Sequence, residues 1–396
     1  MSSRDAMEGR HPDRVERWAA LIRGDKDGEA PKELALTETL HLVFQGPNFG
    51  SCRVSLETNS AELVKKLRHY FKDFVSVKGG EGDEPDILVE CVEREVPLLD
   101  VAFKLKPLAP GKTKLKEEYV DLPNGRLVRK RLTGMVFVFG AETNVGCGPC
   151  ERNDNQVINF INNRFIEWIL KKGYVLGHAA AVSFQGAGLS MAGMSGMGKS
   201  TLALHLMARG TDFVSNDRLM VRRVAEKGGD AGVEMVGVAK LPRINPGTVL
   251  NNEALHGVMP PDRLAELRDL SSESIWDLEE KYDVFLDECF GENKFKLSGK
   301  MDGLVLLNWS RSRVPIEIRE IHLHERRDLL PAFMKSVGLF FYDPGESGGL
   351  KEPDEEAYLR VLGACTVFEI TGGVDFEVAA DACFEYLKTG KMPTGS

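Results

Sequence analysis

The order of hydrophobic and polar residues predicts short strands and helices that alternate along the chain. Segments 40–46 and 52–58 alternate apolar and polar residues, as half-buried strands do. Segment 61–71 repeats its apolar residues three and four positions apart, as an amphipathic helix does, and Asn59 or Ser60 is placed to cap it. These elements predict a unit that mixes strands and helices.

A second β series follows this helix. Segment 86–93 has a strand pattern, and the strand-like segments on either side of Asn124-Gly125 predict a hairpin. The reason is that both residues tolerate the positive φ of a tight primed turn. Residues 38–145 therefore predict a mixed, mainly antiparallel α+β unit, and the spacing of apolar residues over 154–173 predicts a helix after it.

The last third of the chain shows further elements of both kinds. Segments 303–309 and 316–324 have strand patterns, and 374–390 reads as a closing amphipathic helix. The charged run 269–288 has helical spacing punctuated by apolar residues, so it predicts a solvated amphipathic helix.

Composition narrows the class of protein. The chain has 396 residues, of which 42% are hydrophobic, so it can bury a full core and is not disordered as a whole. Its 51 Lys plus Arg against 60 Asp plus Glu give a formal charge of -9, which argues against a nucleic-acid or membrane partner. The apolar runs are too short to span a membrane, and the charged N-terminus lacks the apolar core of an export signal. A cytoplasmic protein is expected.

One segment carries a motif with chemical content. Residues 193–200 read GMSGMGKS, which matches the phosphate-loop pattern G-x-x-x-x-G-K-[ST]. A strand-like segment ends at this loop, and 201–209, a strong helix former, follows it. Strand, loop and helix therefore come in the order that phosphate binding requires.

The residue types of this loop suit a nucleotide phosphate. Gly193, Gly196 and Gly198 let the backbone curl so that successive N–H groups face one centre. Lys199 can bridge the β- and γ-phosphates, and the Ser200 hydroxyl can complete the shell of Mg²⁺, which prefers hard oxygen ligands. The N-terminus of the following helix adds its positive end.

Two further residues stand at suggestive positions around the loop. A short strand after the helix ends at Asn216-Asp217, and a carboxylate there can hold magnesium or accept a proton from an attacking hydroxyl. His178 lies on the strand two before the loop, where it would offer a polar group to the transferred phosphoryl. The alternatives are a turn-forming Asp and a satisfied core histidine.

The cysteines give a weaker signal. Seven cysteines, an odd number, do not predict a disulfide framework. Cys147 and Cys150 form a C-x-x-C motif, which serves thiol exchange, half of a zinc site or simply a loop. No second C-x-x-C or H-x₃-H accompanies it, so the loop interpretation is favoured and the role of the pair stays open.

The string over 177–221 resembles the catalytic core of HPr kinase and of the wider HPr kinase-related group, best the kinase B type. In that group a His-containing strand, a G-x-S-G-x-G-K-S loop and an acidic strand end follow in this order. The resemblance implies an α/β fold with a P-loop kinase core of the HPr kinase/phosphoenolpyruvate-carboxykinase-like type. This catalytic domain would span 151–396, after an N-terminal arm (1–37) and a smaller accessory α+β domain (38–150).

The resemblance also implies an activity. It points to an ATP-dependent kinase that, with Mg²⁺, transfers the γ-phosphoryl of ATP to a hydroxyl of a small molecule or of a Ser in a protein or peptide. Lys199, Asp217 and His178 would be catalytic, and Ser200 with Asp217 would hold the metal. The residues expected to bind ATP form the loop and the start of the helix: Gly193, Met194, Ser195, Gly196, Met197, Gly198, Lys199, Ser200 and Thr201.

The sequence departs from the family pattern at two positions. Asn216 stands where the family has the first acid of an Asp-Asp pair, and Thr201 stands where HPr kinases have a Glu. The general base is therefore either Asp217 or His178. No copy of the family's later phosphorolysis motif is visible, so phosphatase activity is not predicted.

Some alternatives stay open. A nucleotide-binding regulatory ATPase, a switch without a phosphoryl acceptor, is the second interpretation. Additional candidates for anion contacts are Arg218, Lys240 and Arg243. The alternative for each of them is an ordinary surface residue with no ligand. A homo-oligomer is neither predicted nor excluded.

Overall fold

The computed structural model describes residues 15–25, 31–76, 84–107, 114–140, 142–225, 231–271, 274–275, 278, 280–343 and 352–393. The chain divides into two compact units. The first comprises Met1–Phe44, Ser51–Trp168 and Val337–Lys351, and the second comprises Gln45–Gly50, Ile169–Ser336 and Glu352–Ser396. Of the predicted N-terminal arm, residues 1–14 and 26–30 lie outside the described residues.

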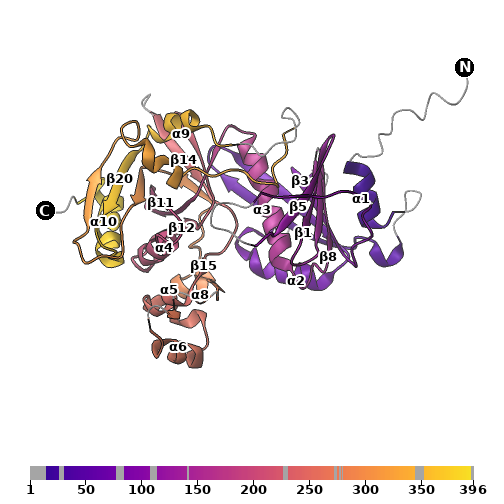
Figure 1. The fold of residues 1–396 in the computed structure, drawn as a ribbon, viewed down its shortest axis with the longest axis horizontal. Coiled ribbons are helices and arrows are strands. Elements are labelled where there is room, and N and C mark those ends of the chain that lie inside the picture. The colour runs from indigo at the N-terminus through magenta and orange to yellow at the C-terminus, as the bar shows by residue number, and fades with distance from the viewer. Residues whose placement is uncertain are drawn as a thin grey trace, which may run out of the picture. The chain divides into compact units, whose positions relative to one another are not determined.

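The first unit is built on an eight-stranded sheet (Figure 1). Its strands are β1 (Glu38–Gly46), β2 (Gly50–Thr58), β3 (Ile87–Glu93), β4 (Lys104–Leu105), β5 (Glu117–Leu122), β6 (Gly125–Lys130), β7 (Val136–Gly140) and β8 (Thr143–Gly148). Their order is β1-β2-β3-β8-β7-β6-β5-β4. Strand β3 runs parallel to β2 and β8, whereas β4 to β7 and β8 pair antiparallel in succession. The sheet is thus mixed and mainly antiparallel, as the sequence predicts.

Helices cover both faces of this sheet, as the alternation along β7 shows. Val136 and Val138 pack in the cluster that includes α1 (Val15–Arg23), whereas Phe137 contacts Phe160 of α3 (Asp154–Leu170), with ring centroids 4.7 Å apart. Successive side chains of a strand point to opposite faces, so α1 and α3 lie on opposite sides. The remaining helices are α2 (Ala61–Tyr70) and two 3₁₀ turns, η1 (Lys32–Leu34) and η2 (Lys72–Phe74).

The predicted α2 cap and the β5–β6 hairpin both form, but the positive φ predicted for Asn124-Gly125 is wrong. Ser60 caps α2 by accepting a hydrogen bond from the Leu63 backbone N–H. The β5–β6 pairing continues to Leu122↔Gly125, yet neither Asn124 nor Gly125 has a positive φ. Gly125 is required instead because a Cβ there would lie 2.2 Å from the Phe139 carbonyl oxygen of β7.

The described residues of the second unit form three sheets. The six-stranded sheet has the order β12-β10-β11-β18-β20-β19, the four-stranded sheet β17-β14-β13-β9, and the two-stranded sheet β15-β16. These strands are β9 (Val175–Gly177), β10 (Ala179–Phe184), β11 (Ala187–Gly193), β12 (Asp212–Ser215), β13 (Leu219–Ala225), β14 (Ala231–Val236), β15 (Arg243–Ile244), β16 (Tyr282–Asp283), β17 (Ser298–Lys300), β18 (Gly303–Leu307), β19 (Glu317–Glu320) and β20 (Thr366–Thr371). The predicted strands in 303–309 and 316–324 are confirmed as β18 and β19.

The six-stranded sheet forms the middle layer of this unit. Ala180 and Val182 of β10 pack with α4 (Lys199–Ala208) and α10 (Phe376–Thr389). Ala179 and Ala181 face the other way, toward the four-stranded sheet, α9 (Glu355–Leu362) and the 3₁₀ turn η4 (Arg327–Ala332). The unit is therefore layered as helices, sheet, and a second sheet with α9, and the predicted helix in 374–390 is α10.

The charged run 269–288 does not form the single predicted helix. Its described part contains strand β16, which pairs with β15, and then the short helix α8 (Leu286–Phe290). The apolar residues that suggested helical spacing, among them Val284 and Leu286, pack in a small core with α5 (Pro246–Leu250), η3 (Glu253–Val258) and α6 (Pro261–Arg268). Tertiary packing therefore overrides the local pattern.

Among the helices that the structure describes, none combines enough length with enough hydrophobicity to cross a membrane.

Candidate functional site

Strand register brings three predicted segments to one edge of the six-stranded sheet. Because Ala179 of β10 pairs with Ala192 of β11, His178 lies next to the start of the glycine-rich loop, defined here as Gly193–Gly198. Strand β12 pairs antiparallel with β10 and ends at Ser215, beside Ala181. Asn216 and Asp217 therefore emerge at the same edge as the loop.

His178 and Asp217 meet because the chain changes sheets at both places. His178 lies between β9 of the four-stranded sheet and β10 of the six-stranded sheet, rather than on a strand as expected. Asp217 lies between β12 and β13, which make the same change, and Leu219 pairs with Gly177. The two crossings are adjacent, and His178 Nε2 lies 3.0 Å from Asp217 Oδ1.

The loop has the backbone shape that its glycines predict. Gly196 and Gly198 have φ of 86° and 82°, in the region that favours glycine. A Cβ on Gly198 would also lie 2.4 Å from the Phe376 ring of α10, and one on Gly193 would lie 3.0 Å from the Leu307 carbonyl oxygen. Two different constraints, backbone conformation and lack of space, thus require glycine here.

Lys199 begins α4 and folds back onto the loop. Its Nζ donates to the Gly193 carbonyl at 2.8 Å and to the Met194 carbonyl at 3.4 Å, and the residue is 8% exposed. Burial lowers the pKa of the Lys199 amine, the neighbouring Lys335 acts in the same direction, and Asp217 opposes both. The amine is held where the loop curls around it.

An aromatic residue that sequence reasoning missed supports the loop from one side. The Trp309 Nε1–H donates to the Met197 carbonyl at 3.0 Å, and the Trp309 ring meets the Phe376 ring edge-on with centroids 5.1 Å apart. Trp309 closely follows β18, whose last residue Leu307 pairs with Gly193. The one available signal was an aromatic residue at the end of a predicted strand.

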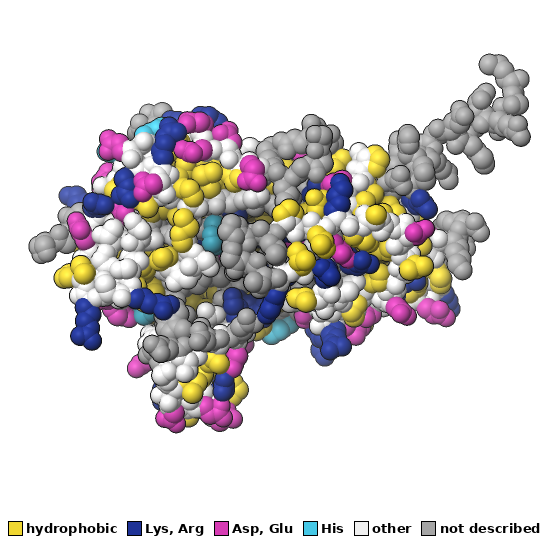
Figure 2. Space-filling view, viewed as in Figure 1, with side chains coloured by type: hydrophobic (Ala, Val, Ile, Leu, Met, Phe, Trp, Pro, Cys, Tyr) yellow, Lys and Arg dark blue, Asp and Glu magenta, His cyan; other side chains and the backbone are white. Residues whose placement is uncertain are grey.

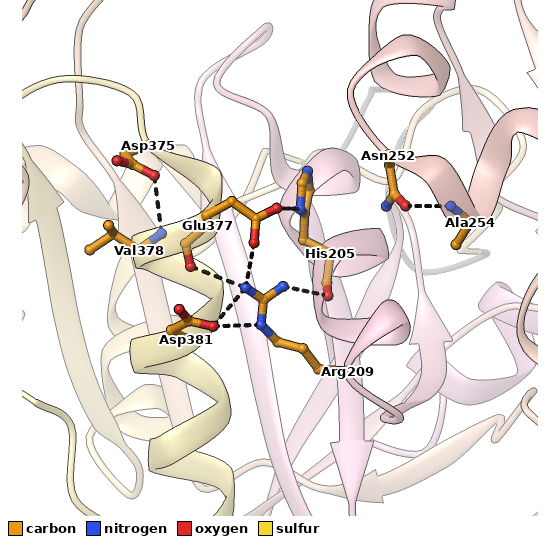
Figure 3. Close-up of polar contacts among 8 residues, drawn as sticks. All are labelled: His205, Arg209, Asn252, Ala254, Asp375, Glu377, Val378 and Asp381. Atoms are coloured by element: carbon orange, nitrogen blue, oxygen red, sulfur yellow. Dashed lines mark hydrogen bonds and ion pairs between the residues drawn. The ribbon is translucent and has the colours of Figure 1, made fainter.

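Charged contacts fix helix α4 against α10 (Figure 3). His205 Nδ1 lies 2.8 Å from a Glu377 carboxylate oxygen, and Arg209 donates to Glu377 at 2.7 Å and to Asp381 at 2.6 Å. The His205 ring stacks on Phe376, with centroids 5.7 Å apart. Because His205 and Arg209 continue the helix that starts at Lys199, these contacts hold the loop's exit in one orientation.

Two cations accompany His178 around Asp217. Lys335 Nζ lies 3.3 Å and Arg218 Nε 3.9 Å from Asp217 Oδ2, and the Asp217 side chain keeps 50% of its surface exposed. Burial raises the pKa of the Asp217 carboxyl, but the hydrogen bond from His178 and the charges of Lys335 and Arg218 outweigh it and hold this pKa far below its ordinary value. Asp217 is a carboxylate at neutral pH.

Lys335 was not predicted, because its place depends on a long-range contact. Met334 forms a bridge with Gly177, and the His178 N–H donates to the Phe333 carbonyl at 2.6 Å. The Tyr358 hydroxyl donates to the Leu176 carbonyl at 2.5 Å and lies 3.4 Å from the Lys335 carbonyl oxygen. Segment 333–335 therefore runs alongside 176–178 and delivers Lys335 to the His178–Asp217 pair.

Both residues that the sequence predicts as magnesium ligands lie at this edge of the sheet. Ser200 follows Lys199 in the first turn of α4, and Asp217 supplies a carboxylate, so both predicted ligands are hard oxygen donors. The Asn216 side-chain oxygen is buried without a hydrogen-bond partner among the described residues. Thr201, by contrast, directs its hydroxyl to Thr248 of α5, 3.1 Å away.

The C-x-x-C motif lies in the first unit and is built into its core. Cys147, on β8, and Cys150 are both fully buried. Burial raises the pKa of the Cys147 thiol to about 12, and a hydrogen bond with Cys91 together with burial raises that of Cys150. Within the described ranges no three or more His, Cys, Asp or Glu side chains form a group that could hold a metal.

Comparisons with known proteins complete the description of the site. No protein-family model matches the sequence, and no curated protein matches it. Among solved structures, the HPr(Ser) kinase/phosphatase from Coxiella burnetii aligns with 54% of this chain and 89% of that chain, at 10% sequence identity and a TM-score of 0.28. A superposition at this score does not establish a common fold, so a functional assignment has to rest on the residues of the site.

Proposed function

We propose that this protein is an ATP-dependent kinase with a P-loop core of the HPr kinase-like type. It transfers the γ-phosphoryl of ATP, with Mg²⁺, to a hydroxyl of a small molecule or of a Ser in a protein or peptide. The observation that carries the proposal is that Lys199 of a glycine-rich loop shares one sheet edge with the His178–Asp217 pair. Nucleotide phosphates and a proton acceptor are the two requirements of phosphoryl transfer to a hydroxyl.

Each residue has a role that its surroundings support. The loop amides and Lys199 bind the phosphates, and Ser200 with Asp217 offers oxygen ligands to Mg²⁺, which supplies charge neutralisation when bound. Asp217 is ionised and half-exposed, so it can accept the proton of an acceptor hydroxyl. His178 orients the Asp217 carboxylate through the 3.0 Å contact.

The test is transfer of label from γ-labelled ATP, with Mg²⁺, to a panel of polyols, sugars and cell-extract proteins. Lys199→Ala is expected to abolish transfer, and Asp217→Asn to lower it by about 10²- to 10⁴-fold, the range for loss of a general base. Lys388→Ala and Asp262→Ala, at exposed positions of the same unit, serve as matched controls and should stay within about twofold of the wild type.

Two results would overturn the proposal. One is phosphate release from ATP that no acceptor accelerates, which would support the regulatory ATPase. The other is label transfer that Lys199→Ala leaves unchanged, because the loop would then not be the nucleotide site.

A further inference from the structure

Positively charged side chains crowd the oxygen of Asp217 that faces away from His178. Lys335 lies 3.3 Å and Arg218 3.9 Å from Oδ2, whereas His178 contacts Oδ1. The Lys335 and Arg218 side chains are 25% and 36% exposed, so both are partly enclosed and still reachable by a ligand. Asp217 Oδ2 therefore faces two cations.

Lys335 and Arg218 carry like charges beside the same carboxylate oxygen and therefore repel each other. An anion bound between them would relieve this repulsion.

The loop supplies donors of its own for the phosphates of ATP, namely the loop amides, Lys199 and the N-terminus of α4. Arg218 follows Asp217 directly and Lys335 follows η4, so both come from elements other than the loop. Their shared feature is proximity to Asp217, the candidate proton acceptor.

Proximity to Asp217 places these cations near the acceptor. A hydroxyl that donates to Oδ2 lies about 2.7 Å from it, and hence within about 6 to 7 Å of Lys335 Nζ and Arg218 Nε. This span corresponds to two or three carbon atoms. A neutral polyol offers nothing to these amines, whereas a phosphate or carboxylate a few atoms from the hydroxyl would bind them.

We propose that the acceptor is a small hydroxyl compound carrying a phosphate or carboxylate group, and that Lys335, with Arg218, binds this anionic group. The proposal rests on the proposed kinase function and narrows its substrate class. In the step itself, the acceptor oxygen forms a bond to the γ-phosphorus, the bond from that phosphorus to the bridging oxygen breaks, and ADP leaves. The hydroxyl proton passes to Asp217 and then to solvent.

The experiment measures binding to the full-length protein saturated with Mg²⁺ and a non-hydrolysable ATP analogue. Titration calorimetry compares neutral and anionic members of three matched pairs: glycerol with glycerol 3-phosphate, glucose with glucose 6-phosphate, and propane-1,2-diol with lactate. In at least one pair the anionic member is expected to bind 10-fold or more tightly than the neutral one. The phosphate and lactate arms distinguish the two anion chemistries.

Substitutions of Lys335 test whether this residue causes the preference for the anionic compound. Lys335→Gln is expected to lower the affinity for the anionic member 10-fold or more, and Lys335→Arg, which keeps the charge, to stay within threefold. The exposed Lys388→Gln is the matched control and should change nothing. The far-UV circular dichroism spectra of all three variants should match that of the wild type, which shows that they fold.

The two proposals fail in different ways. If the ATP analogue binds and no anionic member is preferred, or if Lys335→Gln leaves the preference intact, the anionic acceptor is wrong and the kinase stands. Label transfer to Ser residues of extract proteins and to no small molecule would have the same meaning. If the analogue does not bind, or binds independently of Lys199, the proposed function itself is wrong.

Discussion

The contact between Gly198 and Phe376 allows a quantitative test of how the glycine-rich loop is held. Gly198→Ala places a methyl group 2.4 Å from one carbon of the Phe376 ring and 2.6 Å from another, at a backbone φ of 82°. The ring has little freedom to move, because it stacks on His205 and meets Trp309 edge-on. The loop or the ring must therefore shift.

The chain supplies its own control for this change. Gly196 has nearly the same φ, 86°, but a Cβ there meets no atom within 4 Å. Gly196→Ala should therefore cost only the backbone strain, about 1 to 2 kcal/mol of unfolding free energy. Gly198→Ala adds overpacking of about 1 to 3 kcal/mol, for a total of about 2 to 5 kcal/mol.

The assay is equilibrium unfolding in urea, followed by circular dichroism, together with affinity for an ATP analogue. In a Phe376→Ala background the cost of Gly198→Ala should fall to that of Gly196→Ala, since the obstructing ring is gone. Equal destabilisation by the two glycine substitutions in the wild type would refute the reasoning. So would a cost of Gly198→Ala that the Phe376→Ala background does not reduce.

Three further predictions concern stability. Burial lowers the pKa of His205 although Glu377 raises it, so on acidification the unfolded state takes up a proton before the folded state does. The free energy of unfolding should therefore fall as the pH drops below about 6.5. Urea titrations at pH 7.5 and 5.5 should show that this free energy falls less in His205→Gln than in the wild type. Gly125→Ala, which sets a methyl group against a backbone carbonyl, should cost about 1 to 3 kcal/mol in the same unfolding assay, with unchanged nucleotide affinity. Replacing Cys147 and Cys150 together by Ser buries two hydroxyls and should cost about 1 to 3 kcal/mol for each one left unsatisfied, while calorimetry finds nucleotide affinity intact.

Elements with strong local signals could be predicted from the sequence. Helix α2 has both the apolar spacing and a capping residue, Ser60, which makes the predicted hydrogen bond. The segment from Gly193 to Ala208 combines glycines with a strong helix former, and it folds as a loop followed by a helix. In these cases propensity, pattern and tertiary packing favour the same conformation.

The incorrect expectations share a physical cause. Segment 269–288 has helical spacing, but two of its residues, Tyr282 and Asp283, pair with β15 and interrupt any helix. Gly125 was assigned to a turn that needs positive φ, whereas the neighbouring strand β7 sets the requirement. Both outcomes depend on partners distant in sequence, which a local pattern does not contain.

The residues of the candidate site differ in the same way, because some have a local sequence signal and others depend on a long-range contact. Lys199 and Asp217 could be proposed from the sequence because each stands at the end of a recognisable element, whereas Lys335 has no such pattern around it. Its position depends on the approach of segment 333–335 to Gly177, where a Cβ would lie 2.4 Å from the Phe333 ring. The contact thus requires a glycine at position 177, directly before His178, and this glycine is its visible sign in the sequence. Any larger residue there would displace Lys335 and His178 together, so these two partners of Asp217 share one packing requirement.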